Sequence, residues 1–165
     1  MVSFEQICNL HELEEIHQIK KRAFEQLYIK YQDAQSPFNE PFAALKEKYE
    51  RPDNYYFKIK NKAEVVGYLR IVTNTAANEA RISPIAIQPS DAGAGYGTQA
   101  MLLAEKTFPT IKKWHLSTIF QEEKLRHFYS KLGYEQIGAV EPIQAGMDLI
   151  YFTKNLKQEE KRKEN

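Results

Sequence analysis

Residues 85–101 read Ile-Ala-Ile-Gln-Pro-Ser-Asp-Ala-Gly-Ala-Gly-Tyr-Gly-Thr-Gln-Ala-Met, and this stretch decides the fold. An apolar strand pattern comes first, glycines follow at the alternate positions 93, 95 and 97, and a helix pattern comes last. Glycine permits positive φ and lets a ligand approach the backbone closely. The first turn of a helix offers unpaired N–H groups and a partial positive charge. This order is typical of a site that binds phosphate oxygens.

Two well-known phosphate-binding loops do not fit this stretch. A Walker A loop needs a lysine before its Ser or Thr, whereas Thr98 follows Gly97 directly. A dinucleotide-binding loop has the pattern G-x-G-x-x-G in a parallel βαβ unit. Here the pattern is G-x-G-x-G, and the strands before it look antiparallel. A flexible loop without a ligand is the alternative, and the apolar strand and helix beside the loop argue against it.

Helices and strands are mixed along the rest of the chain, which favours a sheet covered by helices on both faces. Pro84 lies inside a predicted strand, and proline is tolerated in a sheet only at an edge, a start or a bulge. We therefore expect a bulge or splay near Ser83–Pro84. In chain order we predict a weak strand over 2–8, a helix over 10–32, a helix from 39–41 to 51, strands over 55–59, 65–71 and 79–87, a helix over 98–108, a strand over 114–120, a helix over 122–132, and strands over 134–140 and 147–153 joined through Glu141-Pro142.

The composition excludes several classes of protein. The chain has 165 residues and 19.2 kDa, which suits one domain, with 42% hydrophobic and 27% charged residues. Lys+Arg number 23 and Asp+Glu 22, so we expect no nucleic-acid partner, because such proteins are usually strongly basic. No apolar run reaches the roughly 18 residues of a membrane span, so we expect no membrane partner.

The compartment and the domain bounds follow from local composition. Residues 1–20 carry several glutamates and no apolar core of a secretory signal. Cys8 is the single cysteine, so an internal disulfide is excluded, and we interpret it as a small buried residue. We expect a soluble, cytoplasmic protein with one domain over residues 1–156. Residues 157–165 contain no apolar side chain and are predicted to form a disordered, charged tail.

A second segment strengthens the interpretation of the loop. Residues 128–134, Phe-Tyr-Ser-Lys-Leu-Gly-Tyr, place a tyrosine, two residues, Leu-Gly and an aromatic at the end of a predicted helix. Together with Ile85–Pro89 and Gly93–Gly97, this segment resembles the GNAT superfamily of acyl-CoA-dependent N-acetyltransferases over roughly residues 79–138. Three positions depart from the family pattern. Ala92 replaces the usual Gln or Arg near the pyrophosphate, Glu122 replaces a frequent Asn, and Leu125 replaces a frequent small residue.

The resemblance implies both the fold and the cosubstrate. The fold would be α/β, with a mixed, mostly antiparallel sheet of about seven strands, helices on both faces and a splayed strand pair at the acetyl-CoA loop. Acetyl-CoA would be the cosubstrate, with pantetheine beside Ile85 and Ile87, and the N–H of Ile85 or Ala86 would stabilise the oxyanion. The predicted cofactor-binding residues are Ile85, Ala86, Ile87, Ala92, Gly93, Ala94, Gly95, Tyr96, Gly97 and Thr98.

Acetyl transfer to an amine needs a proton acceptor and a proton donor. The resemblance makes Tyr129 the candidate general acid, because a phenol with a pKa near 10 can protonate a thiolate. Its place on an apolar helix stripe also fits a structural tyrosine. Glu79 and Glu122 are the candidate bases, with a water chain as the alternative. We interpret His115 and His127 as surface or satisfied histidines. No spacing of His, Cys or Asp predicts a metal site.

The acceptor site would lie between the first helices and the last strands, as the resemblance implies. Tyr28, Tyr31 and Asp33 are predicted to contact a cationic amine, with Asp33 attracting it and a tyrosine stacking on it. Alternatively, the tyrosines form an inward stripe and Asp33 is a turn residue. The acceptor would be a small-molecule or peptide amine, and a homodimer through the last strands stays open. The competing functions are a non-catalytic acyl-CoA-binding regulatory module on the same fold and a protein adaptor with a vacant loop.

Overall fold

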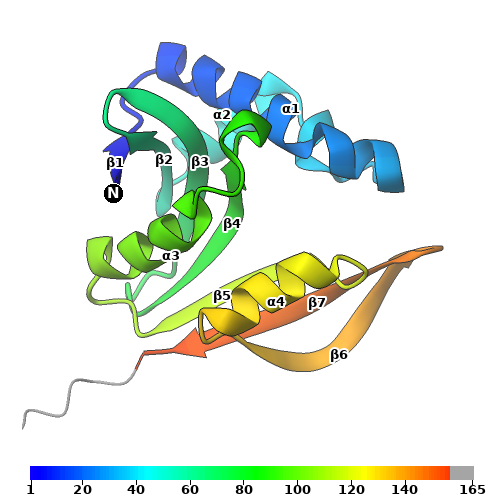
Figure 1. The fold of residues 1–165 in the computed structure, drawn as a ribbon. Coiled ribbons are helices and arrows are strands. Elements are labelled where there is room, and N and C mark those ends of the chain that lie inside the picture. Colours follow the sequence, from blue (N-terminus) through cyan, green and yellow to red (C-terminus); the bar gives the residue numbers. More distant parts are fainter. Residues whose placement is uncertain (157–165) are drawn as a thin grey trace, which may run out of the picture.

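The fold is built on a seven-stranded sheet whose strands follow the order β1-β2-β3-β4-β5-β7-β6 (Figure 1). The computed structural model describes residues 1–156, so the predicted tail at 157–165 lies outside the described residues. Neighbouring strands are antiparallel except β4 and β5, which are parallel. This arrangement confirms the predicted fold class. The elements are β1 (Val2–Gln6), α1 (Leu10–Tyr31), η1 (Pro37–Asn39), α2 (Phe42–Glu50), β2 (Asn54–Asn61), β3 (Glu64–Thr73), β4 (Glu79–Ile87), η2 (Pro89–Asp91), α3 (Tyr96–Thr107), β5 (Lys113–Ile119), α4 (Glu123–Lys131), β6 (Glu135–Gln144) and β7 (Met147–Asn155).

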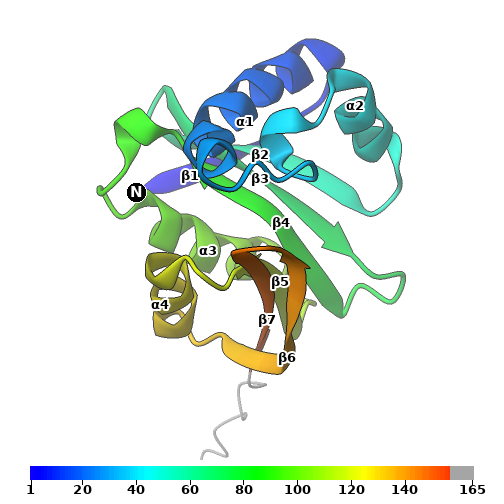
Figure 2. The ribbon, with the colours of Figure 1, turned by 90° about the vertical axis from the view of Figure 1, so that its right-hand side faces the viewer.

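Helices cover both faces of the sheet (Figure 2). On one face, α1 and α2 bury Leu13, Ile16 and Leu45 in a cluster with side chains of β2 and β3. On the other face, α3 and α4 bury Met101 and Tyr129 in the larger cluster. The apolar spacing that predicted these helices is therefore the spacing of the side chains that enter the two clusters.

Helix α1 begins with the capping pattern that the sequence predicts. Asn9 Oδ1 accepts a hydrogen bond from the Glu12 N–H at 2.9 Å, and Glu12 Oε2 accepts one from the Cys8 N–H at 2.8 Å. The helix ends at Tyr31, where Gln32 adopts a left-handed conformation with φ of 52°. The chain then turns back across the end of the sheet, so the last turn of α1 and the loop after it lie near β4.

Strands β4 and β5 diverge soon after they begin. They pair only where Glu79–Arg81 of β4 faces Lys113–His115 of β5. Beyond these residues β4 continues beside β3, whereas β5 continues beside β7 (Figure 1). The edge of β4 that faces β5 has no strand partner from Ile82 to Ile87. This divergence is the predicted splay.

The second half of β4 is irregular, as Pro84 predicts. Leu69 pairs with Ile85 and Ile71 pairs with Ile82, so β4 spends one more residue than β3 between the two pairs. After this bulge the strands approach closely at Gly67. A Cβ atom at position 67 would lie 2.1 Å from the Ala86 carbonyl oxygen, which no side chain permits. Gly67 therefore lets β3 support the end of β4.

One sequence prediction of the fold is wrong. Glu141-Pro142 is predicted to connect the last two strands, whereas both residues lie within β6 and pair with β7. The connection is instead the turn at Ala145–Gly146, with Gly146 at φ of 77°. Strand β6 is the edge of the sheet, and an edge strand tolerates proline because one side of it needs no hydrogen bonds.

Candidate active site

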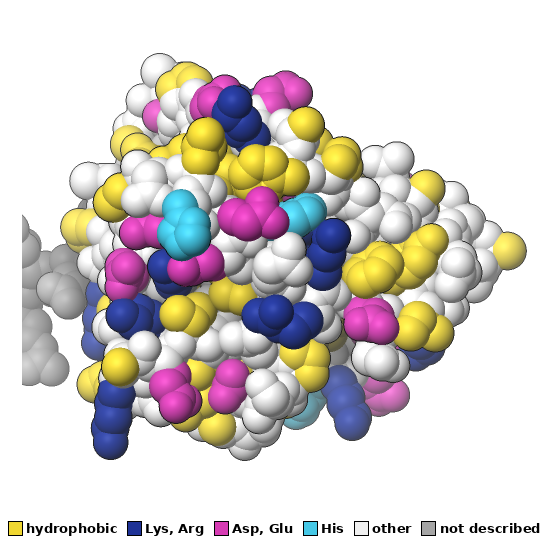
Figure 3. Space-filling model, turned by 90° about the horizontal axis from the view of Figure 1, so that it is seen from above, with side chains coloured by type: hydrophobic (Ala, Val, Ile, Leu, Met, Phe, Trp, Pro, Cys, Tyr) yellow, Lys and Arg dark blue, Asp and Glu magenta, His cyan; other side chains and the backbone are white. Residues whose placement is uncertain are grey.

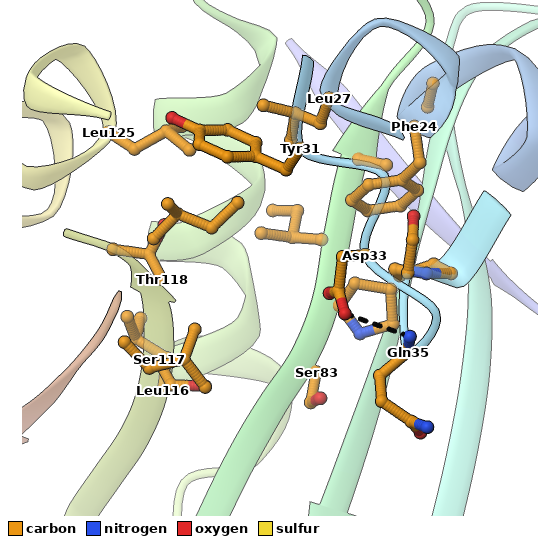
Figure 4. Close-up of a pocket in the computed structure, with 18 of the residues that line it drawn as sticks. Phe24, Leu27, Tyr31, Asp33, Gln35, Ser83, Leu116, Ser117, Thr118 and Leu125 are labelled. Carbon is orange, nitrogen blue, oxygen red and sulfur yellow. Dashed lines mark hydrogen bonds between the residues drawn. The ribbon is translucent and has the colours of Figure 1, made fainter. Parts of the chain in front are cut away.

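A cavity of about 520 Å³ lies where β4 and β5 diverge (Figure 4). Residues 82–87 of β4 and 116–119 of β5 form two of its walls. Helix α1 with the loop after it, helix α4, and the β6–β7 hairpin contribute the other walls. Segments that are distant in the sequence thus meet around one cavity. The positions of the predicted site residues are described below relative to this cavity.

Helix α1 turns one stripe of its side chains toward the cavity. Phe24, Leu27 and Tyr31 follow one another at helical spacing and all line the space. Asp33, in the loop after the helix, lines it as well. The predicted contact of Tyr31 and Asp33 with a common cleft is therefore supported by the geometry.

A buried ion cluster fixes the chain after this loop. Lys20 is 1% exposed, and its Nζ donates to the Glu40 carbonyl oxygen at 2.9 Å and to Glu40 Oε1 at 3.0 Å. Lys48 Nζ lies 2.5 Å from Glu40 Oε2. Burial works to raise the pKa of Glu40, but hydrogen bonds from Lys48 and Lys20 outweigh it and hold that pKa below the usual value. The cluster ties α1 to α2 and so positions Asp33 between them.

The end of α1 is connected to the opposite side of the cavity. The Tyr31 hydroxyl donates to Glu122 Oε2 at 2.5 Å, and Lys30 Nζ donates to the same oxygen at 2.7 Å. Gln144 Nε2, at the end of β6, donates to the Tyr31 carbonyl oxygen at 2.5 Å. We call these four residues the clasp. The sequence predicts roles for Tyr31 and Glu122 separately, and the structure brings the two side chains together.

The clasp keeps Glu122 ionised. Partial burial works to raise the pKa of Glu122, but hydrogen bonds from Lys30 and Tyr31 outweigh it, so the pKa lies below its usual value. The pKa of Tyr31 is raised by burial and by its hydrogen bond to Glu122. At neutral pH the pair is therefore a neutral phenol that donates to a carboxylate. Glu122 does not itself line the cavity, and it reaches the space only through Tyr31.

Tyr129 lines the cavity from α4 and is 8% exposed. Its ring packs among Phe128, Tyr134 and Phe152. Burial raises the pKa of Tyr129 to about 12, so its hydroxyl is protonated at neutral pH. The residue thus belongs to the core and also places a protonated hydroxyl group at the cavity wall.

The backbone of β4 distinguishes Ile85 and Ile87 from Ala86. The Gln88 N–H donates to the Val66 carbonyl oxygen at 2.7 Å, so the backbone groups of Gln88 face β3. Backbone groups alternate in direction along a strand, so those of Ala86 also face β3 and those of Ile85 and Ile87 face the gap. Of the two predicted oxyanion donors, Ile85 is therefore the one that points toward the gap, and Ala86 is not.

The glycine loop leads into α3 beside the end of β4. Gly93 and Gly95 both have φ of 83°, a conformation that favours glycine. Gly95 caps α3 without a side-chain hydrogen bond, so the first-turn amides of α3 have no capping acceptor there. A Cβ at Gly97 would lie 3.3 Å from Phe128 and 3.9 Å from Ile87, which places α3 against both α4 and β4. The Ala92 N–H, by contrast, donates weakly to Pro89 at 3.3 Å.

Several predicted residues lie away from the cavity. Glu79 stands at the paired end of β4, where its Oε1 is 2.9 Å from His115 Nε2. Tyr28 stacks on Phe38 with ring centroids 4.9 Å apart and does not line the cavity. His127 is exposed on α4. Cys8 is exposed as well, so its interpretation as a buried residue is wrong.

Other residues of the site carry no signal that singles them out in the sequence. Lys30 and Gln144 of the clasp, and Ser117 and Thr118 of β5, are polar residues of common types without a motif. The contacts of Lys30 and Gln144 join the end of α1 to Glu122 and to β6, whereas Ser117 and Thr118 line the cavity. Of these contacts, only the charge of Lys30 opposite a glutamate could have been anticipated, and only once the ends of α1 and α4 were known to meet.

The sequence from residue 13 to residue 134 matches the model of the acetyltransferase (GNAT) family. This match covers more than half of the chain, so the chain belongs to the acetyltransferase (GNAT) family and is an enzyme domain of the acetyltransferase class. No curated protein matches the sequence.

Solved structures with the same fold include several N-acetyltransferases. The ribosomal-protein-S18-alanine N-acetyltransferase from Escherichia coli aligns with a TM-score of 0.76 and 13% identity, over 98% of each chain. The spermidine N-acetyltransferase from Vibrio cholerae, solved with CoA and spermine, aligns with a TM-score of 0.74 and 18% identity, over 93% of this chain and 95% of that one. The PaiA N-acetyltransferase from Thermoplasma acidophilum, solved with coenzyme A, gives 0.71 and 16%, over 94% and 99%. At these identities the likeness concerns the fold.

Two further observations concern residues 1–156. Within them, no three His, Cys, Asp or Glu side chains come together in a way that could hold a metal ion. None of the helices in this part of the chain is both long enough and apolar enough to cross a membrane.

Proposed function

We propose that this protein transfers an acetyl group from acetyl-CoA to a primary amine by direct attack in a ternary complex. The observation that carries the proposal is the unpaired edge of β4 at Ile85 and Ile87, which borders the cavity and ends beside the first turn of α3. A thioester with a long amide-bearing arm and a pyrophosphate suits this arrangement. The arm needs backbone partners, and the pyrophosphate needs amide donors.

The glycine loop and the first turn of α3 would bind the pyrophosphate. Backbone N–H groups from Gly93 to Thr98 are the proposed donors, supported by the positive φ of two glycines and by the uncapped start of α3. Ala92 contributes no polar side chain, so binding here would depend on the backbone. The pantetheine amides would pair with the outward-facing groups of Ile85 and Ile87.

The reaction would proceed on the cavity side of this edge. The free amine nitrogen attacks the thioester carbonyl carbon, which forms the C–N bond and a tetrahedral oxyanion. The Ile85 N–H, which faces the gap, is the proposed oxyanion donor. Collapse of the intermediate breaks the C–S bond, and the Tyr129 hydroxyl donates its proton as charge develops on the sulfur.

The amine must lose one proton, and the clasp offers a path for it. Tyr31 lines the cavity and donates to the ionised Glu122. The amine proton would pass to the Tyr31 oxygen while the Tyr31 proton passes to Glu122. Glu79 forms no part of this path, because it lies at the paired end of β4 beside His115. Glu122 is thus the proposed base, acting through Tyr31.

The substitution Tyr129→Phe tests this proposal. We expect kcat to fall about a hundredfold, the usual scale for loss of a general acid, while acetyl-CoA binding is retained. Tyr134→Phe is the matched control. Tyr134 is also a buried tyrosine, 4% exposed, but it does not line the cavity, so kcat should not change. Activity would be measured as thiol release and binding by calorimetry.

A second outcome would favour the non-catalytic alternative. Wild-type protein that binds acetyl-CoA tightly but releases no thiol with any primary amine would be an acyl-CoA-binding module. Equal kcat in the Tyr129→Phe and Tyr134→Phe variants would remove Tyr129 from the mechanism while leaving acetyl transfer intact.

A further inference from the structure

Very few charged side chains line the cavity. Among the lining residues of the described chain, Asp33 is the single side chain that carries a formal charge at neutral pH. Neither a lysine nor an arginine lines the space. The Glu122 carboxylate nearby does not line the cavity, and its Oε2 accepts hydrogen bonds from Lys30 and Tyr31 in the clasp. A cation in the cavity would therefore find one available carboxylate.

Asp33 is held so that part of its carboxylate stays available. Its Oδ1 accepts a hydrogen bond from the Gln35 N–H at 3.0 Å, which fixes the rotamer of the side chain. Its Oδ2 takes part in no hydrogen bond or ion pair found among residues 1–156. Figure 4 shows the side chain reaching from the loop after α1 into the cavity. An ammonium group can thus bind Oδ2 without displacing the turn.

Most of the side chains in the walls around this carboxylate are apolar, and the polar ones among residues 83 and 116–119 are the hydroxyls of Ser83, Ser117 and Thr118. Phe24 and Leu27 of α1 lie on one side, and Ile119, Met147 and Leu149 of β5 and β7 lie on the other. These side chains would contact the body of a substrate whose ammonium group is near Asp33. A second positive charge among them would lose its hydration and gain neutral hydroxyl partners but no second carboxylate, which is costly.

The outer surface offers no alternative attraction for a polycation on the side formed by α1. Figure 3 shows acidic and basic side chains interspersed on this face, without a continuous acidic area. Attraction of a cationic substrate therefore depends on the local contact with Asp33 and not on an extended field.

We propose that the acceptor is a primary amine with one positive charge and an apolar body, whose ammonium group is bound by Asp33. This proposal rests on the proposed acetyltransferase function, because it names the substrate class of the same cavity. Asp33 acts as a specificity-determining residue. The bound ammonium releases one proton to solvent to give the free amine that attacks, and the nitrogen then loses its second proton by the path through Tyr31.

Two amines of equal size test the proposal. n-Pentylamine and 1,4-diaminobutane have the same number of heavy atoms, and the second replaces the terminal methyl group by another ammonium group. Calorimetric titration of each into the CoA-saturated protein gives a dissociation constant without turnover. We expect n-pentylamine to bind at least tenfold more tightly than the diamine. From n-propylamine to n-pentylamine, each methylene should tighten binding about fourfold.

Asp33→Asn tests the role of the carboxylate. This variant keeps the size of the side chain and should weaken n-pentylamine binding about tenfold or more, since it removes a charged partner. Glu25→Gln is the matched control, because Glu25 is an exposed carboxylate on α1 that does not line the cavity. It removes the same charge and should change binding less than twofold.

Three results would overturn the proposal. These are tighter binding of the diamine, equal effects of Asp33→Asn and Glu25→Gln, and binding of none of the amines by a protein that binds CoA. Failure of the proposed function has different signatures. The protein would then either not bind CoA in the titration that precedes the amines, or bind CoA and the amines but release no thiol from acetyl-CoA.

Discussion

The two ends of β4 differ in what lies beside them. At its start, Glu79–Arg81 pair with β5, and the polar contact found there, between Glu79 and His115, joins the two strands. At its end, Ile85 and Ile87 pair with β3 on one edge and face a cavity on the other. The same strand therefore pairs with strands on both of its edges at its start, whereas at its end the backbone groups on one edge have no strand partner. Function is expected where the sheet leaves its own hydrogen bonds unmade.

The largest effect should come from a change that removes the support of the open end. Gly67→Ala would place a Cβ 2.1 Å from the Ala86 carbonyl oxygen. Because rotation of a side chain can move neither atom, the two strands must separate. We expect the free energy of unfolding to fall by about 3 kcal/mol, at the upper end of overpacking effects. Urea unfolding followed by circular dichroism measures this. A loss below about 0.5 kcal/mol would show that β3 does not constrain β4 at this point.

Gly97→Ala provides the contrast to Gly67→Ala. The nearest atom to its Cβ is the far end of the Phe128 side chain at 3.3 Å, which can move by a few tenths of an ångström. We expect a smaller loss of stability than at Gly67. The two variants thus separate a backbone contact from a side-chain contact at the same end of β4.

A smaller effect should distinguish the carboxylates at the two ends. The folded pKa of Glu122 lies below its usual value of 4.5, so Glu122 contributes stability that is present above that value and is lost as the pH falls through the folded pKa. Glu122→Gln should therefore lower the free energy of unfolding at about pH 7, and the difference from wild type should be smaller at about pH 3, because it is lost as the pH falls through the folded pKa. Urea titrations at both pH values measure the change.

Glu79→Gln is the control for this measurement. The hydrogen bond from His115 lowers the pKa of Glu79, so the sign of the pH dependence is the same. However, the Glu79 side chain is 43% exposed, against 19% for Glu122, so solvent screens the contact of Glu79 with His115 more.

The same carboxylates can be compared in activity. Glu122→Gln and Tyr31→Phe should cause equal losses of activity that do not add in the double variant, whereas Glu79→Gln should not change the activity. Additive losses would contradict a shared proton path.

Local patterns in the sequence were sufficient to predict β4 and the glycine loop that follows it. The bounds of β4, the irregularity at Pro84 and the glycine loop before α3 follow from periodicity and from the conformational limits of proline and glycine. The error at Pro142 has the same origin. Proline is tolerated in an edge strand, but the sequence does not reveal that β6 lies at the edge of the sheet.

The site was less predictable because its contacts join distant segments. Tyr31 and Glu122 are separated by 91 positions, and no periodicity indicates that the ends of α1 and α4 meet. Tyr28 and Tyr31 lie near each other at the end of α1, but Tyr28 stacks on Phe38 of the following loop, whereas Tyr31 lines the cavity. The spacing in the sequence does not distinguish these two environments. The direction of the Ile85 N–H likewise depends on the pairing of β3 with β4.

Thermal unfolding with and without acetyl-CoA tests the central claim most directly, namely that the open end of β4 and the glycine loop bind this thioester. At about 100 times the dissociation constant, a ligand that binds only the folded protein adds about 2.7 kcal/mol, which raises Tm by several degrees. ADP, which carries a pyrophosphate but no pantetheine arm, should raise Tm less. A folded protein whose Tm is unchanged by acetyl-CoA, or is raised equally by ADP, would contradict the account.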